Sequence, residues 1–263
     1  MGAIGAIAGK EIRVYLTTWV SYVIFAIFML ITAFFFQRLV VEYQLQSIEF
    51  GQYAKHMLDQ MNLTDWIIGP LLQNVVVFFV FMLPILTMRL ISEERSGKTL
   101  ALLLTSPVRP IEIVLGKYIA AVVLMTIMLA LTLVFPILLE VFGSSSADVL
   151  ILDWNSIGTG YLGMFLLGSG FVSIGLFASS MTESQIVAVI ISFFITLMFI
   201  VIGIASKGQN EMWAQIINYI SATSHVEHFL RGIIRLQDVV YYLSVSFVGV
   251  FLSYRVVEAE RWR

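Results

Sequence analysis

Six long apolar stretches constrain this chain more than any other feature of its sequence. None contains Asp, Glu, Lys, Arg or His, and a helix of about 20 apolar residues crosses the ~30 Å hydrocarbon core of a bilayer. Only 12% of the residues are charged, against about a quarter in a soluble domain. The sequence therefore predicts an all-α integral membrane protein that forms one domain over residues 1–263. We expect six transmembrane helices, at about 19–37, 66–88, 118–139, 154–182, 184–206 and 239–254.

The distribution of Lys and Arg predicts the orientation of these spans, because cytoplasmic loops carry an excess of positive charge. With the N-terminus in the cytoplasm, ten of the 15 basic residues fall inside. An even number of spans then returns the C-terminus to the cytoplasm. The ten residues are Lys10, Arg13, Arg89, Arg95, Lys98, Arg109, Lys117, Arg255, Arg261 and Arg263.

The sequence makes specific predictions for two of the segments expected on the outer side of the membrane. Residues 38–65 are predicted to form a polar loop. Residues 210–236 carry apolar side chains at helical spacing on both sides of a Ser-Ala-Thr-Ser break, which predicts two short amphipathic helices that lie in, or dip into, the outer interface. The second contains His225 and His228. We expect these on its polar face rather than around a metal, because a zinc-binding helix spaces its histidines by four.

The N-terminal stretch up to Trp19 fits a short interfacial helix and, equally well, a polar segment that leads into the first span.

The tripeptide Gly97-Lys98-Thr99 has the sequence that ends a phosphate-binding P-loop. That loop needs another glycine five positions before its last one, where this chain has Ser92, and a strand of an α/β sheet before it. Nowhere do short strands alternate with soluble helices. The sequence therefore predicts no nucleotide site here.

The segment that contains this tripeptide is the only sizeable inner one, residues 89–117 between the second and third spans. Glu93 and Glu94 begin a helix, placed at 92–107, that becomes leucine-rich and ends before Pro107, because proline disfavours helix at the preceding residue. The two glutamates would face the positive end of the helix dipole. Such a helix suits docking into a groove of a soluble partner. The alternative is that the segment only reverses the chain.

Two runs resemble a known family. "SEERSGKTLALLLTSPVRPIEIVLGK", residues 92–117, resembles the signature of ABC-2 type transporter permeases. "GMFLLGSGFVSIGLFASSMTESQIVA", residues 163–188, is similar to the gliding-motility-associated branch of that family. The resemblance covers nearly the whole chain in the order of its spans. This sequence departs from it at Lys98, where the family commonly has Gly, and at Ala101, where it commonly has Glu.

The resemblance implies that the inner helix is a coupling helix that contacts an ATPase. By matched position, the coupling residues would be Glu93, Glu94, Thr99, Leu102, Leu103 and Pro107. It implies a dimer of ABC ATPase subunits that binds ATP and Mg, so this chain would hold no cofactor and catalyse no reaction. It also implies a second permease subunit, identical or homologous, an accessory extracytoplasmic protein in some assemblies, surrounding membrane lipids and no nucleic acid. The location would be a bacterial inner membrane.

Small residues in the fourth span and a proline in the second are further candidates. Ser169, Ser173, Gly175 and Ser179 are small residues at spacings that let helices approach closely. A serine nucleophile among them would need a base within the membrane, and no span contains His or Lys. Pro84 should kink the second span near its cytoplasmic end, which makes it a hinge candidate.

We therefore expect the permease subunit of an ATP-driven ABC-2 exporter, which moves an unidentified, lipid-like or polymeric substrate by alternating access. The lack of charged residues in the spans favours an energy source outside the chain. The alternative is a membrane anchor or force-transmitting part of a cell-envelope machine, without a transported substrate.

Overall fold

The computed structural model describes residues 2–53, 62–100, 103, 108–142, 152–206 and 219–260, and these form helices and turns without a strand. Six helical stretches among them are long and apolar enough to cross a membrane. The prediction of an all-α, six-span membrane protein is therefore confirmed. The elements are α1 (Ala3–Thr17), α2 (Trp19–Tyr53), η1 (Thr64–Ile68), α4 (Gly69–Thr87), α5 (Arg89–Ser96), α7 (Pro110–Leu131), α8 (Val134–Phe142), α9 (Trp154–Met181), α10 (Gln185–Ser206), α12 (Ala222–Leu230) and α13 (Leu236–Glu260).

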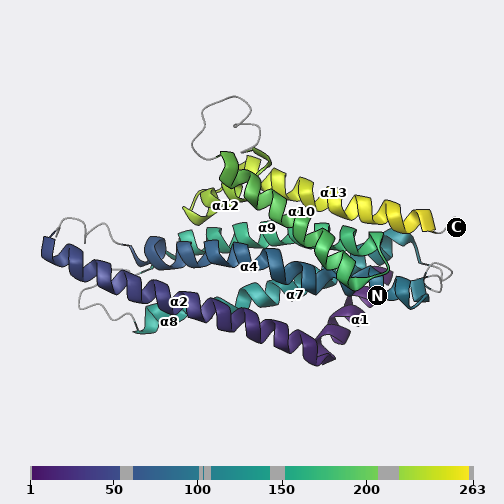
Figure 1. The fold of residues 1–263 in the computed structure, drawn as a ribbon, viewed down its shortest axis with the longest axis horizontal. Helices are drawn as coiled ribbons and strands as arrows, with labels where there is room; N and C mark the ends of the chain where they lie inside the picture. The colour runs from purple at the N-terminus through teal and green to yellow at the C-terminus, as the bar shows by residue number, and fades with distance from the viewer. Residues whose placement is uncertain are drawn as a thin grey trace.

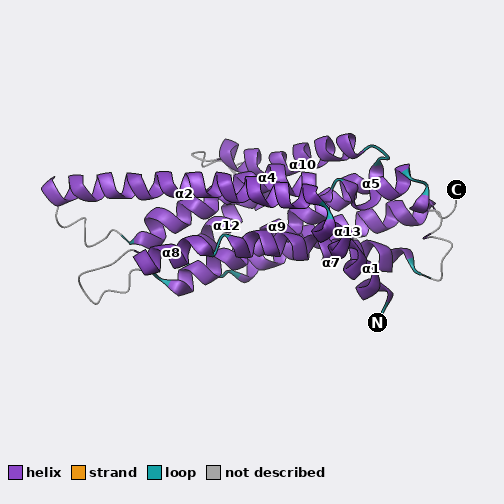
Figure 2. Cartoon of the chain, turned by 90° about the horizontal axis from the view of Figure 1, so that it is seen from below, coloured by secondary structure: helices purple, strands orange, loops and turns teal. Residues whose placement is uncertain are grey.

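Both termini lie at one end of the helix bundle, which we call the terminal end (Figure 1). Figure 2 shows that α1 and α5 lie at this end, while α8 and α12 lie towards the opposite one. The short turn from α9 to α10, residues 182–184, also lies at the terminal end. An even number of spans requires this arrangement whichever way the protein faces in a membrane.

Helix α9 forms the centre of the bundle. In its most apolar stretch 83% of the residues are buried, compared with 17% in α2 and 28% in α10 and in α13. It packs against α4, α5, α7, α10, α12 and α13. Its glycines allow this, because a Cβ atom on Gly163 would lie 2.5 Å from Phe229 and one on Gly168 would lie 2.1 Å from the sulfur of Met125.

Helices α9 and α7 start at recognisable caps. The Asp153 carboxylate accepts a hydrogen bond from the backbone N–H of Asn155, which satisfies a donor that the first turn of α9 leaves free. A hydrogen bond from the Ser156 hydroxyl lowers the pKa of Asp153, since it stabilises the charged form. Helix α7 starts at Pro110, where the missing N–H costs no hydrogen bond.

The first span is much longer than its apolar core. Helix α2 continues to Tyr53, so the prediction of a polar outer loop from residue 38 is wrong for residues 38–53. At about 1.5 Å per residue, α2 is ~52 Å long and extends beyond a ~30 Å hydrocarbon core. Figure 1 shows its far end reaching past the neighbouring helices. Hydropathy marked only the part of the helix that matches lipid.

The segment before the last span contains helix α12, and the first predicted outer helix falls on residues outside the described ones except 219–220, which are helical. Helix α12 ends at Leu230, earlier than predicted, because Gly232 adopts a left-handed φ of 77°. The N–H of Ile233 bonds to the carbonyl of His228 and that of Gly232 to the carbonyl of Phe229, which is a Schellman cap.

Candidate functional site at the terminal end

The second span is interrupted at the terminal end. Helix α4 ends at Thr87 and α5 begins at Arg89, with Met88 between them. Pro84 lies inside α4, one turn before the interruption, and its carbonyl accepts the N–H of Met88 at 2.9 Å. The hinge candidate from the sequence is therefore next to the break and not at it, and a role in movement stays a prediction.

A serine from α9 stabilises the start of α5. The Ser179 hydroxyl oxygen accepts hydrogen bonds from the backbone N–H groups of Ile91 and Ser92, at 3.0 and 3.1 Å, and donates to the carbonyl of Met88 at 2.8 Å. One turn earlier, Gly175 lets α9 approach α4 so closely that a Cβ atom there would lie 2.0 Å from the Thr87 hydroxyl. The structure thus places Ser179 and Gly175 against the α4–α5 break.

The other two small residues of the predicted set face a different helix. The hydroxyl oxygen of Ser169 is 3.2 Å from that of Ser246 in α13, and the Ser173 hydroxyl is 3.3 Å from the carbonyl of Val245. A Cβ atom on Gly249 would lie 2.4 Å from the Ser173 hydroxyl oxygen. The set therefore divides between two interfaces of α9 and does not form one stripe.

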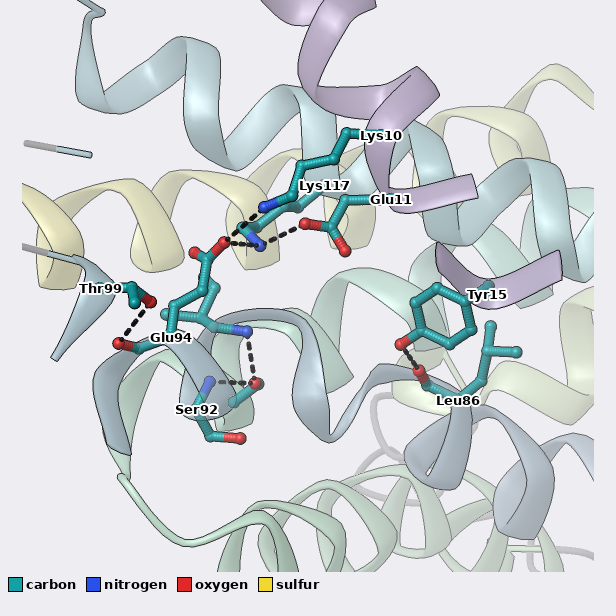
Figure 3. A network of polar contacts seen from close by, with 10 residues as sticks. Lys10, Glu11, Tyr15, Leu86, Ser92, Glu94, Thr99 and Lys117 are labelled. Carbon is teal, nitrogen blue, oxygen red and sulfur yellow. Dashed lines mark hydrogen bonds and ion pairs between the residues drawn. The ribbon is translucent and has the colours of Figure 1, made fainter. Parts of the chain in front are cut away.

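A buried ion-pair network joins α1, α5 and α7 (Figure 3). Lys117 of α7 has a side chain only 2% exposed, and its Nζ lies 2.9 Å from Glu11 Oε1 and 3.0 Å from Glu94 Oε1. Lys10 approaches the same oxygen of Glu94 at 3.7 Å from a largely exposed position. Two carboxylates around one buried ammonium provide the compensation that a charge needs away from water.

A tyrosine of α1 contacts both sides of the α4–α5 break. The Tyr15 hydroxyl donates a hydrogen bond of 2.6 Å to the carbonyl of Leu86 (Figure 3). The guanidinium carbon of Arg89 lies 4.0 Å above the Tyr15 ring. The second contact is a cation–π interaction. Burial raises the pKa of Tyr15 to about 12, so the hydroxyl keeps the proton that it donates.

Helix α5 is also attached to the far end of the chain, because Arg95 Nη2 pairs with Glu260 Oε1 near the C-terminus of α13. Together with Ser179 and Glu94, this contact links one eight-residue helix to α1, α7, α9 and α13. A displacement of α5 must therefore strain contacts with four other helices.

Helix α5 ends in a conformation that usually requires glycine. Lys98 has a φ of 56°, in the left-handed region, and its N–H bonds to the carbonyl of Arg95 at 3.1 Å. The hydroxyl of Thr99 donates to the carbonyl of Glu94. These are the positions of a glycine-based helix cap, and Lys98 occupies the place where the resembled family commonly has Gly.

The predicted coupling residues lie in different environments. Glu93 and Thr99 are exposed and Leu103 is half-buried, while Glu94 is held in the network around Lys117. Leu102 and Pro107 lie outside the described residues.

Two expectations for this segment are wrong. The helix does not run unbroken from 92, because α5 ends at Ser96 and a turn follows at 97–98. The glutamates do not face a helix N-terminus either. Glu93 and Glu94 lie in the second half of α5, which has no acidic residue in its first turn. Their positions are explained by the ion pair and the exposed surface instead of the dipole.

A cavity of 580 Å³ lies between α1, α5 and α7 beside this network. Its walls carry both signs of charge. The lining residues are Lys10, Glu11, Val14, Arg89, Glu93, Glu94, Gly97, Thr99, Leu103 and Lys117.

At the opposite end, His225 is buried rather than on a polar face, which corrects the sequence interpretation. Its Nδ1 lies 2.6 Å from Asp238 Oδ1 and its Nε2 lies 2.9 Å from the carbonyl of Tyr219. His228 Nδ1 is 3.0 Å from the other oxygen of Asp238, within ion-pair distance but not aligned for a hydrogen bond. These contacts attach α12 to the first turn of α13. Among the described residues, no cluster suited to a metal ion is found.

Sequence reasoning missed three residues that make polar contacts at the terminal end, Lys117, Glu11 and Tyr15. Lys117 was counted only as a positive charge near a membrane surface, and Glu11 and Tyr15 only as part of the N-terminal stretch. Of the two alternatives for that stretch, the structure has a helix, α1. A weak signal was present, because Glu11 and Tyr15 are four residues apart and so share a helix face.

Six long membrane-spanning stretches, with the small-residue helix α9 at their centre, define a multi-pass α-helical membrane protein whose densest charged contacts among the described residues lie at the terminal end. Residues 5–257 match a protein family described as ABC-2 family transporter protein. The chain belongs to this family and is a transmembrane permease component of an ABC transporter, which implies an ATPase partner. The family predicted from the sequence is thereby confirmed. No curated protein matched the chain.

Proposed function

We propose that this chain is the membrane subunit of a bacterial inner-membrane exporter, and that a separate ATPase dimer with bound ATP and Mg acts on it through α5. The observation that carries the proposal is the position of α5. It lies at the terminal end, presents Glu93 on its surface, and is attached by polar contacts to α1, α7, α9 and α13. A partner that moves α5 can therefore move the bundle.

The substrate route would lie between two permease subunits, identical or homologous, each contributing this bundle. The buried polar contacts at both ends fit a subunit that changes shape by shifting whole helices, because charge pairs and hydroxyl–carbonyl bonds have discrete alternative arrangements. A lipid-like or polymeric substrate and an accessory extracytoplasmic protein belong to this proposal as well.

The docking surface is tested with two glutamates of equal charge at the same end. Glu93→Ala removes an exposed carboxylate from α5, and Glu183→Ala removes one from the exposed turn between α9 and α10. The permease is reconstituted in nanodiscs, and its affinity for the co-expressed ABC ATPase is measured together with the rate of ATP hydrolysis. We expect Glu93→Ala to weaken binding about two- to fivefold, as the loss of an exposed ion pair does, and Glu183→Ala to have no effect. Equal effects of both variants would contradict docking at α5.

The alternative of a force-transmitting component makes a different prediction for the same preparation. An exporter in proteoliposomes moves a labelled lipid when ATP is supplied, and hydrolysis rises with that lipid. ATP hydrolysis that never responds to any lipid or polymer tested, in a complex that still assembles, would favour the alternative.

A further inference from the structure

Lys117 is an unusual residue for a helix that crosses a membrane. It lies two turns into α7, its side chain is 2% exposed, and its ammonium is shared between two carboxylates at nearly equal distances, 2.9 and 3.0 Å. One carboxylate, Glu11, belongs to α1 and the other, Glu94, belongs to α5. A fully buried ammonium needs a partner, but one would be enough to neutralise it.

We propose that Lys117 is a positioning residue that makes α7 respond to the movement of α5, because that movement releases Glu94 from its ammonium; the inference rests on the proposed function of α5. Helix α5 packs chiefly on α9, and the pair between Glu94 and Lys117 reaches across to α7. The second partner, Glu11, keeps the ammonium neutralised when Glu94 moves. The transition therefore breaks one ion pair and never leaves a bare buried charge.

The two carboxylates differ in how well they are satisfied. Glu94 uses a single oxygen for both lysines, and its Oε2 is buried without a hydrogen-bond partner. A buried acceptor without a partner is unfavourable, so Glu94 gains when it moves to where that oxygen is hydrated. Glu11 has no such atom among the described ones. Glu94 is therefore the partner that leaves, and Glu11 the one that stays.

The same geometry supplies a matched pair of variants. Glu94→Gln and Glu11→Gln each leave Lys117 with one carboxylate, at the same distance and with the same burial, since the two side chains are 12% and 11% exposed. They differ in the helix that is disconnected, and Glu94→Gln also removes the longer pair with the exposed Lys10, at 3.7 Å. If Lys117 has a merely structural role, both variants should affect the response of α7 to ATP in the same way. If Lys117 links α5 to α7, only Glu94→Gln should abolish that response.

The test is amide hydrogen exchange, followed by mass spectrometry, on the complete permease–ATPase complex in nanodiscs with and without ATP and vanadate. In the native complex we expect trapping to change exchange in α5 and in the first turns of α7, residues 110–117. Glu94→Gln should keep the change in α5 and lose it in α7, and Glu11→Gln should keep both. Lys117→Arg, which retains the cation, should also keep both.

Other results would contradict either the role of Lys117 or the proposed function of α5. A change in α7 that survives in Glu94→Gln, or that is lost in both glutamine variants, overturns the role of Lys117. Loss of ATPase binding in Glu94→Gln also overturns it, because Glu94 would then be a docking residue. No change in α5 of the native complex refutes the proposed function itself.

Discussion

The contact between α9 and the α4–α5 break makes a quantitative prediction for Gly175→Ala. An added Cβ atom would lie 2.0 Å from the Thr87 hydroxyl oxygen and 2.8 Å from Thr87 Cβ. Rotation of the threonine side chain relieves the first contact but not the second, because Cβ does not move with χ1. The two helix backbones must therefore separate. Rotation also gives up the hydrogen bond from the hydroxyl to the carbonyl of Leu83.

Two effects of opposite sign set the size of the change. Overpacking of a tight interface costs about 1–3 kcal/mol, and alanine in place of glycine within a helix gains about 0.5–1 kcal/mol. We expect a net loss of about 0.5–2 kcal/mol in the free energy of unfolding. For a chain of this size that corresponds to a melting temperature lower by about 1–8 °C.

The matched control is Gly158→Ala in the same helix, where an added Cβ atom meets nothing within 4 Å. Only the gain in helix propensity remains there, so the melting temperature should stay equal or rise. Both variants are purified in detergent and followed by the fluorescence of the five tryptophans during heating. Adding Thr87→Ala to Gly175→Ala removes the contact with the hydroxyl but keeps the contact with Cβ, so it should restore only part of the loss. An unchanged melting temperature for Gly175→Ala, or an equal loss for Gly158→Ala, would refute the close-packing argument.

Three further substitutions test the terminal end, each by the same melting assay. Ser179→Ala leaves two buried backbone N–H groups of α5 without acceptors, so it should lower the free energy of unfolding by about 1–3 kcal/mol. The control is Ser180→Ala, which should cost little because that hydroxyl donates to a carbonyl of its own helix. Equal losses for the two would show that Ser179 is not a cap. Tyr15→Phe removes the hydrogen bond to the carbonyl of Leu86 and should cost about 0.5–1.5 kcal/mol; no loss would mean that water replaces the hydroxyl. Lys98→Gly relieves about 1–2 kcal/mol of strain from the left-handed backbone at residue 98, but it also adds conformational freedom to the unfolded chain. We therefore expect the free energy of unfolding to rise by about 0.5–1 kcal/mol. A lower free energy of unfolding would show that a contact holds the side chain of Lys98.

Hydropathy placed the six spans because it measures what the bilayer requires. Their far ends were less predictable, as α2 shows by remaining helical to Tyr53. Beyond the hydrocarbon core, water can hydrogen-bond to the backbone, so polarity no longer separates a helix from a loop. Similarly, the spacing of Ser169, Ser173, Gly175 and Ser179 indicated close approach, but only the crossing of the helices decided which neighbour each one contacts.

The sequence by itself determined the class of the molecule, its number of spans and its family, because these follow from local hydropathy and from a contiguous motif around α5. It did not determine that Lys117 is shared between Glu11 and Glu94, residues separated in the chain by 83 positions. Nor did it show that His225 meets Asp238. In the sequence, a charged residue near the end of a span looks the same whether it faces water or a charged partner. Only the packing of α1, α5 and α7 brings these three charges together and buries them.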